Sequence, residues 1–241
     1  MTITKTSSFA LILLASLAFT NCEKSEDDDQ ISKKVSEDDA VELIENSVDQ
    51  STGGMNETIE SYSEILITDF AINDSCSREY DTSYTYIYSG PISSASYTVN
   101  WAYSLKCTFG IPDSVDLKVE NAGTHSTNRM SSIDSSSAEL IIAGLRPTAS
   151  HLTFNGNLNR KGSQTISVNN NSRNISSTIN ISLNSVMVDK SDSEISSGTA
   201  DISVIANNGI QNYTYNGILS FLGNGLASLS MNGNTYPINL K

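Results

Sequence analysis

The sequence has few basic residues. Its 241 residues include 14 lysines and arginines against 27 acidic residues, which gives a formal net charge of -13 at pH 7. An acidic balance without a basic cluster argues against nucleic acid as a partner. Eleven of the acidic residues lie between residues 23 and 49, so the rest of the chain is only mildly acidic.

The sequence also lacks the established catalytic motifs. It contains no G-x-S-x-G, no H-E-x-x-H, no glycine-rich phosphate loop and no cysteine pair at metal-binding spacing. Of its two histidines, we expect His125 in a loop spanning residues 121–132 and His151 at the start of a strand. Neither has a nearby cysteine that would favour zinc. We therefore predict no catalytic residue, no metal and no cofactor.

Two groups of carboxylates are candidates for a metal-binding or catalytic site. Asp189, Asp192 and Glu194 could bind calcium in a strand connection, but their spacing lacks the glycine turn and terminal glutamate of an EF-hand. Asp69 and Asp74 could form an acid and base pair. In both cases solvated loop residues are the favoured interpretation.

The N-terminal apolar run is too short to cross a bilayer. It extends over 11 residues, from Phe9 to Phe19, where a spanning helix needs roughly 20. Lys5 precedes it and Cys22 follows it, an arrangement typical of a secretory signal that ends at a cysteine to be alkylated by diacylglycerol. The residue before the cysteine is Asn21, where a small residue is commonest. We interpret residues 1–21 as a lipoprotein signal peptide and Cys22 as the lipidation site.

An acidic run follows the cysteine, from Glu23 to Asp29, and is too polar to enter a core. Here the chain resembles the lipoproteins of Bacteroidota-type bacteria, in which a short acidic stretch after the lipidated cysteine is a surface-export signal. The resemblance implies an outer-membrane location, at the cell surface or on the periplasmic face, with the membrane as partner through Cys22. A plain solvated tether over residues 22–35 is the alternative.

Residues 36–67 are predicted to form a helical hairpin on the sheet. Ser36 and Asp39 have the spacing of a capping box. Two apolar stripes at helical spacing follow, one before and one after Gly53-Gly54. Their members are Val41, Ile44 and Val48 in the first stripe, and Met55, Ile59, Tyr62 and Leu66 in the second.

Residues 68–241 are predicted to form a mostly β domain, an antiparallel meander that is sandwich or barrel-like. The composition shifts here to Ser, Thr, Asn, Tyr and Ile with a period of two. Strand candidates run from Tyr80 onward, and Asn208-Gly209, Asn224-Gly225 and Asn232-Gly233 are hairpin signals. The later hairpins, with Tyr215-Asn216-Gly217, are similar to a β-meander of no assigned activity in small Bacteroidota-type lipoproteins.

Apart from Cys22, the predicted lipidation site, the chain has two cysteines, Cys76 and Cys107. An even number of remaining cysteines in an exported protein predicts that they form one disulfide. If these cysteines oppose each other in an antiparallel pair, the turn centre falls between Pro91 and Ile92, where the turn residues are. The same register pairs Tyr80 with Tyr103, Thr82 with Trp101, Tyr84 with Val99 and Tyr86 with Tyr97, all on one face.

One face of this hairpin is therefore aromatic and the other mainly polar. Six rings on it are a candidate platform for stacking on sugars: Tyr84, Tyr86, Tyr88, Tyr97, Trp101 and Tyr103. Burial of the rings in the core is the favoured alternative, because that is how a sheet ordinarily uses them.

These observations predict a lipid-anchored envelope lipoprotein with a non-enzymatic binding, adhesion or structural role. A glycan or a protein is the expected ligand class, and the oligomeric state stays open. The alternative is a cell-surface hydrolase or a glycan-binding accessory protein that uses the Tyr/Trp-rich hairpin.

Overall fold

The structure is a computed structural model that describes residues 34–68, 76, 79–168 and 171–241. The predicted signal peptide, Cys22 and the acidic run lie outside the described residues, as do Asp69 and Asp74. Among the residues described, no helix is both long enough and apolar enough to cross a membrane.

Among the described residues, two α-helices precede the sheet. Helix α2 (Glu37–Val48) begins with the predicted capping box, in which the Ser36 hydroxyl accepts the Asp39 N–H at 3.2 Å and the Ser36 N–H donates to the Asp39 carboxylate at 2.7 Å. A 3₁₀ turn, η1 (Gln50–Thr52), connects it to α3 (Met55–Thr68). The predicted helical hairpin is therefore present.

The connection between the helices depends on Gly53. Its φ of +63° lies in the left-handed region, and a Cβ atom there would sit 2.6 Å from Cδ2 of Tyr97. All four residues of the second predicted stripe are buried in α3, and Ile44 and Val48 of the first stripe are buried in α2. Burying an aliphatic or aromatic side chain of this size stabilises the fold by about 1.5 to 3 kcal/mol.

In the described part of the chain, ten antiparallel strands follow in a single sheet whose spatial order is the sequence order. The strands are β1 (Glu79–Ser89), β2 (Ser93–Thr108), β3 (Ile111–Thr127), β4 (Met130–Ala143), β5 (His151–Val168), β6 (Asn171–Asp189), β7 (Ile195–Asn207), β8 (Asn212–Gly223), β9 (Leu226–Met231) and β10 (Asn234–Asn239). The mostly β meander is confirmed. It is a single open sheet, because β1 and β10 are not paired with each other in the described part of the chain.

The first hairpin has the predicted register throughout. Tyr80 opposes Tyr103, Tyr84 opposes Val99 and Tyr86 opposes Tyr97. Cys76 and Cys107 form the predicted disulfide, with their Cα atoms 5.8 Å apart. A bridge between cysteines 31 positions apart stabilises the fold by roughly 3 to 4 kcal/mol in the chain-entropy model.

The strands are longer than their own apolar patterns predicted. The sequence pattern predicts separate strands over residues 151–158 and 163–168, and both are parts of one strand, β5. The loop expected over residues 121–132 is wrong, because β3 continues to Thr127 and β4 starts at Met130. The end of β3 and the start of β4 are rich in Ser, Thr and Asn, so no alternation of apolar residues marks them as strands. Their pairing with each other and with distant strands extends them regardless.

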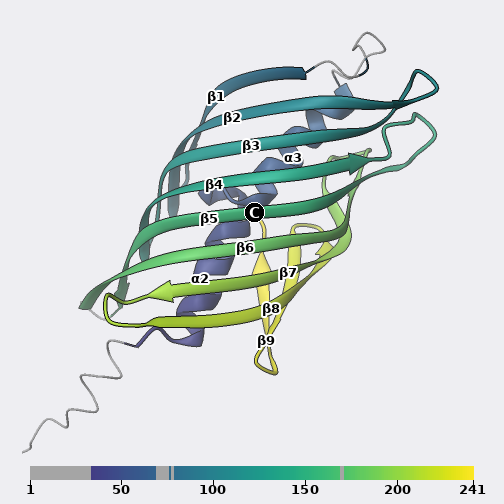
Figure 1. The fold of residues 1–241 in the computed structure, drawn as a ribbon. Coiled ribbons are helices and arrows are strands. Elements are labelled where there is room, and N and C mark those ends of the chain that lie inside the picture. The colour runs from purple at the N-terminus through teal and green to yellow at the C-terminus, as the bar shows by residue number, and fades with distance from the viewer. Residues whose placement is uncertain (1–33, 69–75, 77–78, 169–170) are drawn as a thin grey trace, which may run out of the picture. The chain divides into compact units, whose positions relative to one another are not determined.

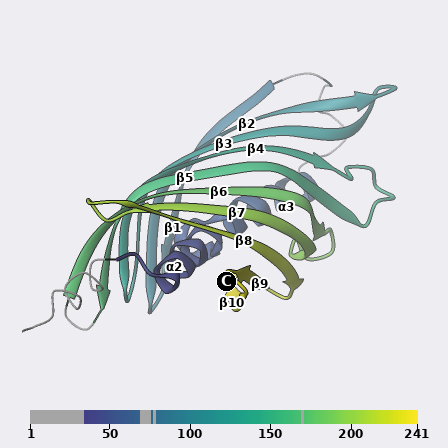
Figure 2. The same cartoon turned by 60° about the horizontal axis from the view of Figure 1, so that its bottom comes forward.

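The helices lie against one face of the curved sheet, which we call the inner face (Figure 1 and Figure 2). Leu105, Leu117, Leu140 and Phe154 are examples of its buried apolar residues. The start of α2 is tied to the sheet by an ion pair between Asp39 and Arg173 of β6, and by a hydrogen bond of 2.6 Å from the Tyr215 hydroxyl to the Val35 carbonyl. The opposite face, which we call the outer face, is open to solvent.

Candidate functional site

A cluster of four polar side chains lies between the sheet and the helices. Tyr97, His125, Asp134 and Arg160 come from four consecutive strands, β2 to β5. They are 2%, 5%, 6% and 8% exposed, respectively. We call them the buried cluster, and they are the first candidate for a functional site because buried titratable groups concentrate at such sites.

Two glycines make room for the buried cluster. Asp134 is paired with Gly123 on one side and with Gly162 on the other. A Cβ atom on Gly123 would lie 2.8 Å from Cδ1 of Tyr97, and one on Gly162 would lie 2.4 Å from Cβ of Asp134. The bare backbone at these positions lets the tyrosine ring and the guanidinium reach the carboxylate from both sides.

The carboxylate of Asp134 accepts hydrogen bonds from three side chains. Arg160 binds it in bidentate fashion, with Nε 2.9 Å from Oδ1 and Nη2 3.1 Å from Oδ2. Ser132 donates at 2.7 Å and the Tyr97 hydroxyl at 3.1 Å. This number of donors satisfies a carboxylate that is almost fully removed from water.

Arg160 also binds the helical segment. Its Nη1 donates to the Asn46 carbonyl in the last turn of α2 at 2.8 Å, and its Nη2 donates to the Thr52 carbonyl at the end of η1 at 3.2 Å. Carbonyls at a helix C-terminus lack partners within the helix and carry partial negative charge. One guanidinium therefore neutralises a sheet carboxylate and caps two helical ends.

The pKa values in the buried cluster are shifted by burial and by charge. Burial alone would raise the pKa of Asp134, but hydrogen bonds from His125, Arg160 and Ser132 and the guanidinium charge hold it well below its usual range. Burial lowers the pKa of His125, and Arg160 adds to the effect. Burial also raises the pKa of Tyr97. The favoured state is an ion pair beside a neutral histidine and a neutral tyrosine.

The neutral ring of His125 has a defined orientation. Its Nδ1 lies 2.9 Å from the Tyr97 hydroxyl and 3.0 Å from Nη2 of Arg160, which can only donate. Nδ1 also lies 3.3 Å from Oδ2 of Asp134, whereas Nε2 is buried without a hydrogen-bond partner among the described residues. The buried cluster has acid and base groups, but its burial beneath α2 and η1 keeps substrate from reaching them.

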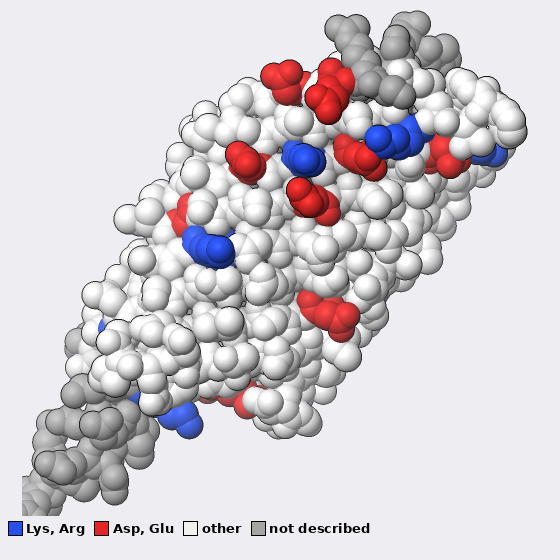
Figure 3. All heavy atoms as spheres, viewed as in Figure 1, with Lys and Arg blue, Asp and Glu red and all other residues white. Residues whose placement is uncertain are grey.

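Two hollows of about 800 Å³ each lie on the outer face, and a smaller one lies beside α2. One of the two on the outer face crosses the strands from β4 to β9. We call it the polar trough. Its outward side chains are mainly hydroxyls and amides: Ser137, Glu139, Asn157, Asn159, Asn180, Ser182, Asp201, Ser203, Asn216, Ile218 and Ser230. Figure 3 shows how few charged side chains this face carries.

The register arranges the polar trough in two parallel rows. Asn157, Ser182 and Asp201 are successive partners in one row, and Asn159 and Asn180 lie in the other. Asn159 donates to Asn180 across the strands at 2.5 Å, and Asp201 accepts from Asn184 at 2.9 Å. Several hydroxyl and amide groups in the rows thus point to solvent on a rigid sheet.

The six aromatic residues of the first hairpin lie on the inner face with α3. Tyr62 of α3 contacts Trp101 edge to face with ring centroids 4.9 Å apart, and the Tyr84 hydroxyl donates to Glu57 at 3.2 Å. Tyr97 is in the buried cluster, while Tyr84, Tyr86, Trp101 and Tyr103 pack against the core. Tyr88, at the end of the strand, is 37% exposed. A ligand role for these rings stays a prediction.

The carboxylates considered for calcium bind their own turn. Asp189 accepts the Ser191 N–H and Asp192 accepts the Glu194 N–H, each at 3.0 Å. His151 starts β5 as predicted, and its Nε2 lies 3.8 Å from Asp189. No group of three metal-binding side chains occurs among the residues that the structure describes.

Sequence reasoning missed the buried cluster. Its members are spread over 64 positions, and no motif in the sequence links them. The signal that could have found it is the isolated glycine inside a strand pattern, at Gly123 and Gly162, which marks close approach of another group.

Comparison with models of known protein families, with curated proteins and with solved structures gives no match.

Removing one partner of the buried ion pair should destabilise the fold strongly. We expect Arg160→Met to lower the free energy of unfolding by about 3 to 5 kcal/mol, because it leaves the Asp134 charge buried without its partner. In the double variant Asp134→Leu and Arg160→Met, the cost should be smaller than the sum of the single costs. Denaturant unfolding of the three variants tests this, and additive costs would contradict a coupled pair.

His125 should make stability depend on pH. Its folded-state pKa lies below the ordinary value of about 6.5, so the unfolded chain binds more protons and stability falls as pH drops below that value. Asp134, with its lowered pKa, contributes stability above about pH 4 that is lost on further acidification. His125→Gln should flatten the slope of unfolding free energy between about pH 6.5 and 5.

The matched control for this experiment is His151→Gln, which changes a half-exposed histidine outside the buried cluster. The measurement is denaturant unfolding over the pH series. An equal loss of slope in both variants would contradict the assignment to His125.

Proposed function

We propose that this chain is a lipid-anchored lipoprotein of the bacterial outer membrane that acts by binding rather than by catalysis. The observation that carries the proposal is the separation of its polar groups. The titratable cluster is enclosed between sheet and helices, while the accessible trough on the outer face is lined by hydroxyls and amides. A surface of this kind supports recognition of a polar ligand more than proton transfer.

The proposed location rests on the N-terminal residues and on the disulfide. The apolar run ends at Cys22 as in a lipoprotein signal, and the acidic run to Asp29 resembles a surface-export signal. The Cys76–Cys107 bridge supports an oxidising compartment outside the cytoplasm.

The polar trough supports a neutral, hydroxyl-rich ligand such as a glycan chain. Its hydroxyl and amide groups can both donate and accept hydrogen bonds, with carboxylates at Glu139 and Asp201 and an aliphatic contact at Ile218, which is 50% exposed. Lys118 lies 3.9 Å from Glu139 and is the cation near this end of the trough. A strongly charged ligand would find little complementary charge there, and a protein ligand is the alternative within the same role.

The other candidates have less support. A hydrolase would need accessible acid and base groups, and the buried cluster lies beneath the helices. A sugar platform on the first hairpin would need its rings in solvent, and Trp101 and Tyr103 instead contact Tyr62. No observation on the structure favours either of these functions.

The anchor can be tested by metabolic labelling. In cells that produce the full chain, a labelled fatty acid should be incorporated into the protein, and Cys22→Ser should abolish the label because the thiol is the acceptor. Cys107→Ser is the matched control, since it removes a different cysteine and should retain the label. Persistent labelling of Cys22→Ser would contradict the anchor.

Ligand binding can be tested on glycan and matrix-protein arrays with the full lipoprotein in detergent. We expect retention on neutral glycans, and Ser182→Tyr should weaken it by about tenfold or more, because the ring fills the trough and displaces hydrogen bonds of about 1 kcal/mol each. Thr98→Tyr, on the same face but outside the trough, should bind like the natural sequence. Failure to bind either array would favour a purely structural role.

A further inference from the structure

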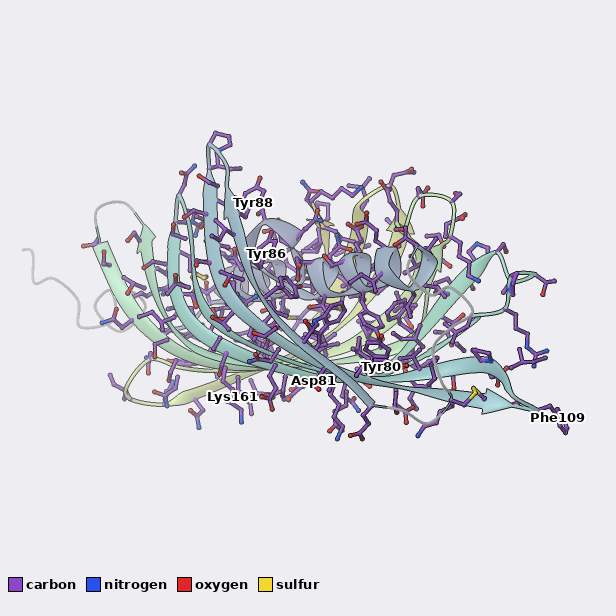
Figure 4. The ribbon with its side chains drawn as sticks, turned by 90° about the horizontal axis from the view of Figure 1, so that it is seen from above. Tyr80, Asp81, Tyr86, Tyr88, Phe109 and Lys161 are labelled. Atoms are coloured by element: carbon purple, nitrogen blue, oxygen red, sulfur yellow. A yellow bond between two sulfur atoms is a disulfide. The ribbon has the colours of Figure 1, made fainter. Side chains whose placement is uncertain are left out.

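The two edges of the sheet differ in their protection. Strand β10 has six residues including Pro237, and the Leu240 carbonyl just beyond it accepts hydrogen bonds from Gln50 and Asn56 of the helical segment. Strand β1 has 11 residues, and in the described part of the chain it pairs with β2 alone. Figure 4 looks onto this edge, where β1 crosses in front of the sheet.

The edge of β1 lacks the features that normally prevent strand pairing. Natural edge strands are short, bulged, or carry charges and prolines. From Thr82 to Ser89, β1 has no charged residue, no proline and no glycine, and its register with β2 shows no bulge. Glu79 and Asp81 at its N-terminal end are its acidic residues. These eight residues are uncharged and mainly aromatic or hydroxyl-bearing, and every second one directs its backbone N–H and C=O away from β2 toward the open edge.

This edge is also held rigidly. On its inner side, the Tyr84 hydroxyl is bound to Glu57 and the Tyr86 hydroxyl donates to the Gln50 carbonyl at 2.7 Å. On its outer side, Thr85 and Ile87 are exposed, Ile87 to 72%. A strand already fixed in its paired conformation loses little conformational entropy when a further strand is added.

We infer that β1 pairs with β1 of a second copy of this chain, antiparallel and about a two-fold axis. A shared inner face requires that opposed residues have the same parity, because side chains alternate along a strand. Centring the pair on Thr85 places Thr85 opposite itself and Tyr84 opposite Tyr86 of the second copy. The sheets of the two copies would then continue into each other.

The distribution of charge favours the antiparallel direction for two copies of this strand. In the centred antiparallel register, Asp81 lies opposite Ser89 of the second copy, so each acidic end meets an uncharged end. A parallel arrangement would set the acids of the two copies side by side, and like charges directly opposed are destabilising. In the antiparallel pair, no acidic residue of β1 lies directly opposite another. The inference concerns assembly and depends neither on the ligand nor on the anchor proposed above.

Disulfide crosslinking of the full chain in cells tests the register. Directly opposed antiparallel residues have Cα atoms about 4.5 to 5.5 Å apart, which is within the range that a disulfide spans. Thr85→Cys should give a crosslinked dimer on a non-reducing gel. Thr98→Cys, exposed on the same face of β2 and opposite Thr85, should stay monomeric. Equal crosslinking of the two variants, or none in Thr85→Cys, overturns the inference.

Charge substitution at the same position is an independent test. Thr85→Lys and Thr85→Glu each place like charges opposite each other, so each purified variant should be monomeric in sedimentation while the natural chain is dimeric. Mixing the two variants should restore the dimer, because opposite charges then meet. Circular dichroism and an intact Cys76–Cys107 bridge check that both variants fold. A monomeric natural chain, or variants that dimerise as well as it does, overturns the inference.

Discussion

The ion pair between Arg160 and Asp134 joins the two layers of this protein. The carboxylate is nearly fully buried on the inner face, and the guanidinium that neutralises it also binds the ends of α2 and η1. A buried charge is costly unless it is paired and hydrogen bonded, so the helices cannot leave the sheet without exposing unsatisfied groups on both sides. This one contact specifies where the helical segment sits.

The placement of the helices divides the two faces of the sheet by role. The inner face is filled by apolar residues, by the aromatic rings of the first hairpin and by the buried cluster. The outer face keeps its hydroxyls and amides in solvent, where they form the polar trough. Any partner met by the described residues must therefore be recognised by neutral polar groups, by exposed side chains or by the free edge of β1.

The parts of the fold that could be predicted from the sequence depend on residues close in sequence or on several independent signals that agree. The capping box at Ser36 and the Asn-Gly turns depend on residues close in sequence. The register of the first hairpin could be predicted because the turn residues, the disulfide and the aromatic pattern all indicate the same pairing. His125 was misplaced in a loop because the strands around it have no alternating apolar signal, and their extension depends on neighbours far along the chain.

The sequence by itself determined the mostly β meander, the helical hairpin before it and the Cys76–Cys107 bridge, because periodicity, turn residues and cysteine parity are encoded locally. Tertiary structure alone decided that the rings of Tyr97 and Trp101 face the helical segment, that the sheet stays open and that Tyr97, His125, Asp134 and Arg160 meet. Those outcomes depend on which face the helices cover and on room left by Gly123 and Gly162, and such contacts form only when distant strands are aligned.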